Sequence, residues 1–249
     1  MKKLSLGMIA WACLLAYALN LSAQTTKVND SGVVNAAGFA SGPVSPGSIV
    51  SIFGTNLATG TGAASSLPLP ATINGTSVVI NGSPAPLFFV SPTQINAQVP
   101  AELEGQIQGS LTVTVNGQTS PAQTVRLAPF GPGVFATNQQ GTGQGAILDA
   151  SGILLDPSHP AIPGSTVLQI YCTGLGAVTN QPPSGTPAPS TPLAATVTTP
   201  TVTIGGAPAT VLFSGLAPGF VGLYQINAQM PAAVTQGNAE PAWGRLGLW

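Results

Sequence analysis

The amino-acid sequence predicts an all-β fold made of two tandem β-sandwiches. The heptapeptide Gln94–Pro100 returns as Gln225–Pro231 with six of seven positions identical, which indicates two copies of one small fold. Short β-branched runs occur at 73–80, 111–115 and 197–204, and helical periodicity is scarce. The 31 glycines and 24 prolines divide the chain into short segments. Many short strands without βαβ alternation are typical of sandwiches.

Dipeptides that favour tight turns connect the expected strands. Asn81-Gly82 and Asn116-Gly117 predict type I′ hairpins, in which both central residues need a positive φ. Gly205-Gly206 stands in place of the first of these in the second copy. The segment Asp149–Gly152 lies between two short aliphatic runs and predicts a further hairpin turn.

Matched segments place the first copy at 33–128 and the second at 129–237. The offset between matched residues grows from 117 near the start to 131 at the repeated heptapeptide, so the second copy carries insertions. They fall at 181–189 and 214–219, in turn-like stretches where a sandwich tolerates extra residues.

The first residues are typical of a signal peptide. Lys2 and Lys3 precede an apolar stretch at 4–19, and Ala23 is a small residue suited to signal peptidase. We therefore expect a signal peptide at 1–23, cleavage near Ala23, a linker at 24–32, and a secreted, extracellular or cell-envelope location. A retained membrane anchor is the alternative, although the apolar stretch is short for a bilayer span.

The end of the second copy departs from the first. After Pro100 the first copy continues into the alternating run 111–115, whereas the atypical tail 238–249 has no such run and holds Trp243 and Trp249. We therefore predict that the second sandwich lacks its last one or two strands. The neighbouring strand would then be an open edge, which can pair with other chains.

Composition excludes several classes of function. Only 4% of residues are charged, against about 25% in average chains, and no basic cluster is present. Nucleic-acid binding is therefore not expected, because it requires cations that neutralise phosphates. No segment after the signal peptide reaches transmembrane length. Cys172 is the one cysteine beyond that peptide, so an intramolecular disulfide is excluded and stability must come from the cores.

Titratable groups are too few to suggest an enzyme. His159 is the only histidine, and with Asp149 and Asp156 it could form a metal site, but a sound site needs three or four ligands and their supporting shell. Glu102 and Glu104 follow Pro100 in an expected loop, and no Gly-x-Ser-x-Gly motif is present. We predict no catalysis, no cofactor and no metal.

The repeated heptapeptide supplies the candidate binding residues. Alternation along an extended strand puts its three amides on one face in each copy. Such a face could bind sugar hydroxyls, or its amides could satisfy backbone groups of neighbouring loops, and their presence in both copies favours the second interpretation. Exposed Trp or Tyr platforms for sugars are scarce, which weakens the first. The candidate ligand-binding residues are Gln94, Asn96, Gln98, Gln225, Asn227 and Gln229.

Longer motifs carry a resemblance to known families. PGSIVSIFGTNLA, INGSPAPLFFVSPTQINAQVP and LTVTVNGQTS resemble an immunoglobulin-like domain of the IPT/TIG (E-set) type. NAAGFASGPVSPGSIVSIFGTNLA and SGLAPGFVGLYQINAQMPA are similar to the Solibacter-type uncharacterised C-terminal domain of secreted bacterial proteins. The resemblance implies two immunoglobulin-like sandwiches and export, and it implies no activity.

These observations predict a non-catalytic module that is secreted or held in the cell envelope. Its role would be structural or protein-binding, with a protein partner that the sequence does not identify. An extracellular glycan-binding module is the alternative.

Overall fold

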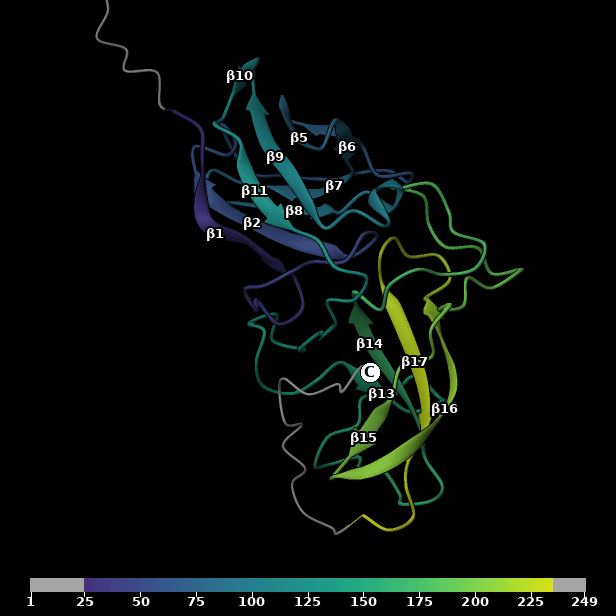
Figure 1. Ribbon diagram of the computed structural model, residues 1–249. Coiled ribbons are helices and arrows are strands. Elements are labelled where there is room, and N and C mark those ends of the chain that lie inside the picture. The colour runs from purple at the N-terminus through teal and green to yellow at the C-terminus, as the bar shows by residue number, and fades with distance from the viewer. Residues whose placement is uncertain (1–24, 235–249) are drawn as a thin grey trace, which may run out of the picture.

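The structure is a computed structural model that describes residues 25–234. These residues form two β-sheet halves, one after the other along the length of the molecule (Figure 1). The only helix in this range is the short 3-10 turn η1, Ala101–Leu103, so the prediction of an all-β, immunoglobulin-like fold is confirmed. The expected signal peptide at 1–23 and tail at 238–249 lie outside the described residues.

The first half packs two sheets against each other. One sheet has the order β1-β2-β8-β7-β3, and the other has the order β10-β9-β5-β4, with β11 beside β9 and β6 beside β5. All pairs are antiparallel. The strands are β1 Lys27–Asn35, β2 Ile49–Thr55, β3 Gly62–Ala63, β4 Thr72–Ile73, β5 Thr76–Ile80, β6 Ser83–Ala85, β7 Leu87–Val90, β8 Gln94–Gln98, β9 Gln108–Val115, β10 Gln118–Thr119 and β11 Gln123–Arg126.

Period-two alternation builds the first core. In β9 the aliphatic residues Leu111, Val113 and Val115 are buried, while the threonines between them are half-buried. Ile52 of β2 and Ile95 of β8 face them from the other sheet and are fully buried in the same cluster. Each such side chain contributes about 1.5–3 kcal/mol of burial free energy.

The predicted hairpin turns are present, and the structure adds one. Asn81-Gly82 and Asn116-Gly117 have positive φ at both residues, as type I′ turns require. Asn74-Gly75 has the same conformation and divides the expected run 73–80 into β4 and β5. Because Asn tolerates the left-handed region, this dipeptide folds as a turn in spite of its β-branched neighbours.

The expected linker at 24–32 was wrong, because β1 begins at Lys27 and pairs with β2. A bulge between Val28 and Val33 interrupts the pairing, and Ser31 there has φ 55°. Val28 is buried on one side of the bulge and Val33 on the other. The irregularity breaks the period-two pattern by which a strand is recognised in a sequence.

The second half is organised around a single sheet of order β12-β14-β17-β16-β15, with β13 also beside β14. Its core contains Ile170, Leu216, Tyr224 and Ile226, together with residues from the long connections. The strands are β12 Gly133–Val134, β13 Ile147–Leu148, β14 Val167–Thr173, β15 Val202–Ile204, β16 Ala207–Leu216 and β17 Tyr224–Gln229.

Three central strands have the same register in both halves. Asn96 of β8 pairs with β2 on one side and with Phe89 of β7 on the other. Asn227 of β17 pairs with β14 and with Phe213 of β16 in the same way. A register shift directly precedes both phenylalanines. This is the geometry that two copies of one fold would share.

The second layer differs between the halves. In the first half β5 pairs with β6 and, on its other edge, with β9. In the second half β15 pairs with the start of β16, and no strand within 25–234 pairs with its other edge. The first half is therefore a sandwich of two full sheets, and we call it closed because β9 covers the edge of β5. Within 25–234 the matching layer of the second half is a two-stranded ribbon.

Two boundaries in the second half differ from expectation. Only Val202–Ile204 of the run 197–204 is a strand, because Pro200 has no N–H to donate to a sheet. The expected insertion at 214–219 is a turn only in its last part, since β16 continues to Leu216 and lengthens the pairing with β17.

Gly174 offers a test of the packing where β14 ends. It has φ +82°, and an added Cβ would lie 2.1 Å from the Gly131 carbonyl oxygen. We expect Gly174→Ala to lower the free energy of unfolding by more than the roughly 1–3 kcal/mol of a strained backbone alone. Gly206→Ala is the matched control, with the same φ and no atom within 4 Å of the added Cβ. Equal losses in urea titrations of the two variants would contradict this account.

Candidate interaction site

The first two amides of the repeated heptapeptide form a hydrogen-bonded pair on the outer face of β8. The Gln94 Nε2 group donates to Asn96 Oδ1 at 2.8 Å, and the Ser51 hydroxyl donates to the same oxygen at 3.0 Å. Both amide side chains are half-buried, whereas Ile95 and Ala97 of the same strand point into the core. Gln94 Oε1 and Asn96 Nδ2 have no partner among the described residues, so an acceptor and a donor remain for a ligand.

The second half repeats this arrangement on β17. Gln225 Nε2 donates to Asn227 Oδ1, again at 2.8 Å. Aromatic residues stand opposite the amides in the neighbouring strands, and all of them are half-buried. We call each set an amide–aromatic face: Gln94, Asn96, Phe53 and Phe89 in the first half, and Gln225, Asn227, Tyr171 and Phe213 in the second.

The third amide has a different environment in each half. Gln98 is buried, its Nε2 group donates to the Gly47 carbonyl at 3.2 Å, and its Oε1 accepts from the Gly185 N–H at 2.7 Å. Gln229 is half-buried and makes one long bond, from Nε2 to the Thr166 carbonyl at 3.4 Å. Gln98 thus satisfies backbone groups, as the alternative interpretation of these amides expected.

Gln98 belongs to a polar junction between the halves that sequence reasoning missed. The Ser184 hydroxyl donates to Glu102 Oε2 at 2.6 Å and accepts from the Ala101 N–H at 2.8 Å. The Leu69 N–H donates to the Gly185 carbonyl at 2.8 Å. Ser184 and Gly185 lie in the insertion 181–189, so the extra residues of the second copy contact the first half. No local pattern in the sequence indicates such a long-range contact.

A second set of hydrogen bonds joins the two halves at Thr173, the last residue of β14. The Thr173 hydroxyl donates to the Gly222 carbonyl at 2.8 Å and accepts from the Ile49 N–H at 2.9 Å. Asn35 Nδ2 donates to the Gly131 carbonyl at 2.7 Å. These side chains hold backbone groups of both halves in one network.

The pKa of Glu102 reflects this junction. Partial burial raises its pKa, but hydrogen bonds from the Ser184 side chain and from backbone N–H groups, including that of Ser184, outweigh burial and place the pKa below the ordinary value. Glu102 is therefore a hydrogen-bond acceptor that joins the halves, and it is ionised at neutral pH.

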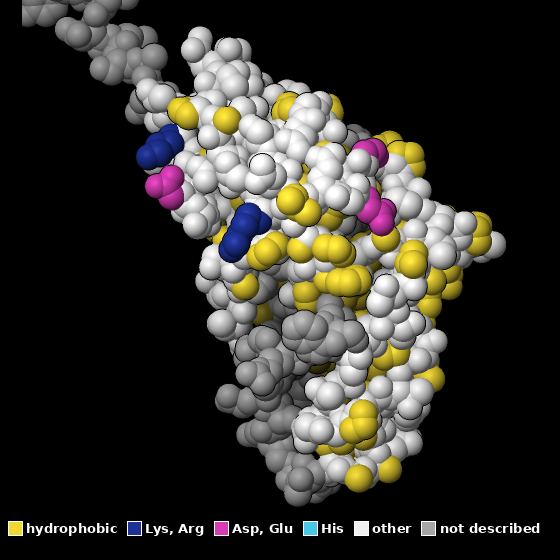
Figure 2. Space-filling view, viewed as in Figure 1, with side chains coloured by type: hydrophobic (Ala, Val, Ile, Leu, Met, Phe, Trp, Pro, Cys, Tyr) yellow, Lys and Arg dark blue, Asp and Glu magenta, His cyan; other side chains and the backbone are white. Residues whose placement is uncertain are grey.

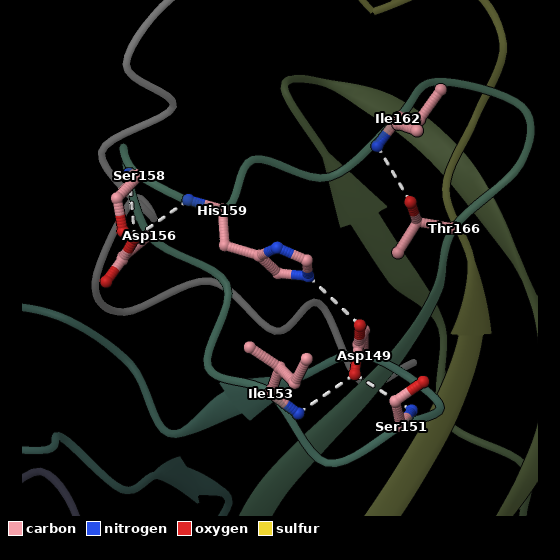
Figure 3. Close-up of polar contacts among 8 residues, drawn as sticks. All are labelled: Asp149, Ser151, Ile153, Asp156, Ser158, His159, Ile162 and Thr166. Carbon is pink, nitrogen blue, oxygen red and sulfur yellow. Dashed lines mark hydrogen bonds and ion pairs between the residues drawn. The ribbon is translucent and has the colours of Figure 1, made fainter.

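Asp149 and His159 come together, as Figure 3 shows, with 3.0 Å between His159 Nε2 and Asp149 Oδ2. Asp149 Oδ1 accepts from the N–H groups of Ser151 and Ile153. The Asp156 carboxylate is turned away from the imidazole, and its Oδ1 accepts from Ser158 and from the His159 N–H (Figure 3). No group of three possible metal ligands occurs within the described residues. Both carboxylates shape turns.

These turns predict how stability depends on pH. The Ile153 N–H and then His159 lower the pKa of Asp149, and bonds from Ser158 lower that of Asp156. Their stabilisation is therefore fully present above the ordinary value of 3.8 and is lost as pH falls below it. We expect melting temperatures at pH 5 and pH 8 to agree within about 10 °C, with a decrease at pH 3. A larger difference between pH 5 and pH 8 would contradict the account.

The Cys172 and Tyr224 side chains are buried. Desolvation raises the pKa of the Cys172 thiol well above its ordinary range. The pKa of the Tyr224 hydroxyl is also raised, first by desolvation and then by the charges of Cys172 and Glu104. The Tyr224 hydroxyl donates to the Gly176 carbonyl at 2.6 Å. Neither residue offers an anionic nucleophile near neutral pH.

The surface carries little charge. Figure 2 shows a few charged side chains on one face, and hydrophobic groups gathered across the boundary between the halves. Lys27 and Arg126 are the only basic residues other than His159 within 25–234. In the same range no helix is both long enough and apolar enough to cross a membrane.

Comparison with known proteins identifies the first half. No curated protein matches the chain. The family model described as "IPT/TIG domain" matches residues 33–126, from within β1 to the end of β11. The matched segment covers all of the first sandwich except residues 27–32 of β1. An IPT/TIG domain is therefore found at residues 33–126 of this chain.

Proposed function

We propose that this chain is a non-catalytic module of the cell exterior, with a structural or protein-binding role. The observation that carries the proposal is the IPT/TIG match to the closed first sandwich, because such domains are typically non-catalytic protein-interaction modules. The described side chains agree, since Asp149, His159 and Glu102 are all engaged in turns or in the junction.

We also propose that 129–237 is a second, diverged copy of the fold. The repeated heptapeptide and the shared register of the three central strands, bulge included, support this. A Solibacter-type family spanning both copies would explain why the insertion 181–189 fits the first half.

Export is the third part of the proposal. The basic start followed by an apolar stretch supports a cleaved signal peptide at 1–23. N-terminal sequencing of protein released from a bacterial host should find a chain that begins at or near Gln24. A retained Met1 in the membrane fraction would contradict export.

Glycan binding is the second candidate, and the amide–aromatic faces favour it. Each face offers an amide donor and an amide acceptor without a partner among residues 25–234, beside aromatic rings, and this combination suits sugar hydroxyls and C–H groups. A glycan array probed with the chain from Gln24 onward tests it. Binding should fall with Asn96→Ala or Asn227→Ala and stay unchanged in the exposed-loop control Ile107→Ala.

In-cell photo-crosslinking separates the two candidates. The Leu127 N–H donates to the Ile107 carbonyl, and Phe130 lies against Gly176, so both residues adjoin the segment that joins the halves. A crosslinking amino acid at exposed Ile107 or Phe130 should give one discrete protein adduct if the module binds proteins there. A positive array without any adduct would replace the protein-binding proposal with the glycan-binding one. If neither an adduct nor a glycan signal is found, the binding role is unsupported.

A further inference from the structure

The outer edge of β15 is unpaired within the described residues. The Gly205-Gly206 turn joins β15 to β16, with Ile204 opposite Ala207 and Thr203 opposite Pro208. In a two-residue hairpin the closing pair is hydrogen-bonded and the next pair is not, so the N–H and C=O of Thr203 point away from β16. Pro208 has no N–H, which agrees with this assignment.

The same position is occupied in the first half. Val79, which matches Thr203, pairs with Thr112 of β9, and Ile80 pairs with Leu111. Ile80 is fully buried there, whereas its counterpart Ile204 is only half-buried. The second half thus has, on the exposed edge of its ribbon, the groups that β9 covers in the first.

The β15 edge has no charge to discourage pairing. The segment 197–229 contains no Asp, Glu, Lys, Arg or His, whereas the edge strands β1 and β11 carry Lys27 and Arg126. Val197 and Leu212 in the same segment are 66% and 57% exposed. Edge strands usually carry charges or other features that oppose pairing, so an uncharged edge is suited to receive a strand.

We propose that the outer edge of β15 accepts an extended strand from another protein, which takes the place that β9 has in the first half. The partner strand runs antiparallel to β15, bonds with the backbone of Thr203, and carries aliphatic side chains at alternate positions, like the Leu-Thr-Val-Thr-Val of β9. This inference rests on the proposed protein-binding function and adds to it a second surface with a stated partner chemistry, separate from the surface around Ile107 and Phe130.

A strand of the β9 type fits this edge better than β15 of a second copy. In β9 three aliphatic side chains enter the core of the sandwich. If β15 of one copy paired with β15 of another, neither strand would add aliphatic side chains to the core of the other copy. β15 is also only three residues long and follows Pro200, which limits the backbone bonds of a self-paired edge.

A labelled peptide with the sequence of residues 108–115 tests the proposal against the full chain. We expect fluorescence anisotropy to show saturable binding of one peptide per chain. Thr203→Pro in the chain should weaken it at least 10-fold, because proline removes the outward N–H and leaves the bonds to β16 intact. Thr203→Val keeps that N–H and should bind as the unmodified chain does. A peptide with proline in place of Thr112 should not bind.

Four results would overturn the inference. The first is no binding at peptide concentrations up to about 1 mM, a Kd that corresponds to a binding free energy of about −4 kcal/mol. The second is peptide binding that Thr203→Pro does not change. The third is protection of the Thr203 amide in the monomeric chain without peptide, which would mean that the chain covers its own edge. The fourth is a dimer that Thr203→Pro abolishes, in a chain that does not bind the peptide. Because photo-crosslinking at Ile107 or Phe130 reports on a different surface, the inference can fail while the proposed function stands.

Discussion

Replacing Ile95 with alanine is expected to lower the free energy of unfolding of the first half by about 2–5 kcal/mol. Ile95 is fully buried in β8, opposite Ile52 of β2 and Val90 of β7, so truncation leaves a cavity at the centre of the core. The loss should appear in urea titrations as a lower midpoint.

Ile107→Ala is the control for this variant. Ile107 is 80% exposed, and its truncation should change stability by less than about 0.5 kcal/mol. Comparable losses in both variants would mean that β8 does not lie at the centre of the core.

Gln98→Leu is expected to cost about 1–3 kcal/mol, because it removes the acceptor of the buried Gly185 N–H. The same change frees the Gly47 carbonyl. Since Gly185 lies in the insertion 181–189, hydrogen exchange of that segment should accelerate and that of β9 should not.

Gln229→Leu is the matched variant in the second half. It removes one long bond from a half-buried side chain and should cost less than about 1 kcal/mol. Equal costs for the two glutamines would show that Gln98 does not hold the junction.

Local rules predicted much of the fold. The Asn-Gly dipeptides and the alternation in β9 depend on neighbouring residues alone, so their turns and strand appear as expected. The linker at 24–32 was wrong because the bulge at Ser31 breaks the pattern. The strand expected at 197–204 was too long because Pro200 interrupts it.

The candidate site was harder to predict, because the environment of each amide side chain depends on residues that are distant in the sequence. Alternation places Gln94, Asn96 and Gln98 on one face, but it does not reveal what covers each of them. Gln98 is covered by Gly185, 87 positions later in the chain, while Gln94 and Asn96 stay half-exposed. For the same reason the turn-rich sequence of 181–189 gave no sign that it contacts the first half.

Native-state hydrogen exchange of the chain from Gln24 onward tests the central claim most directly, which is that a closed sandwich is joined to a half in which no strand within 25–234 pairs with the outer edge of β15. The account predicts strong protection of the inward-bonded amides of β5 and β9 and fast exchange at Thr203 of β15. If residues 197–230 are protected as strongly as 73–115 in a monomeric chain, the second half is closed as well and the account is contradicted.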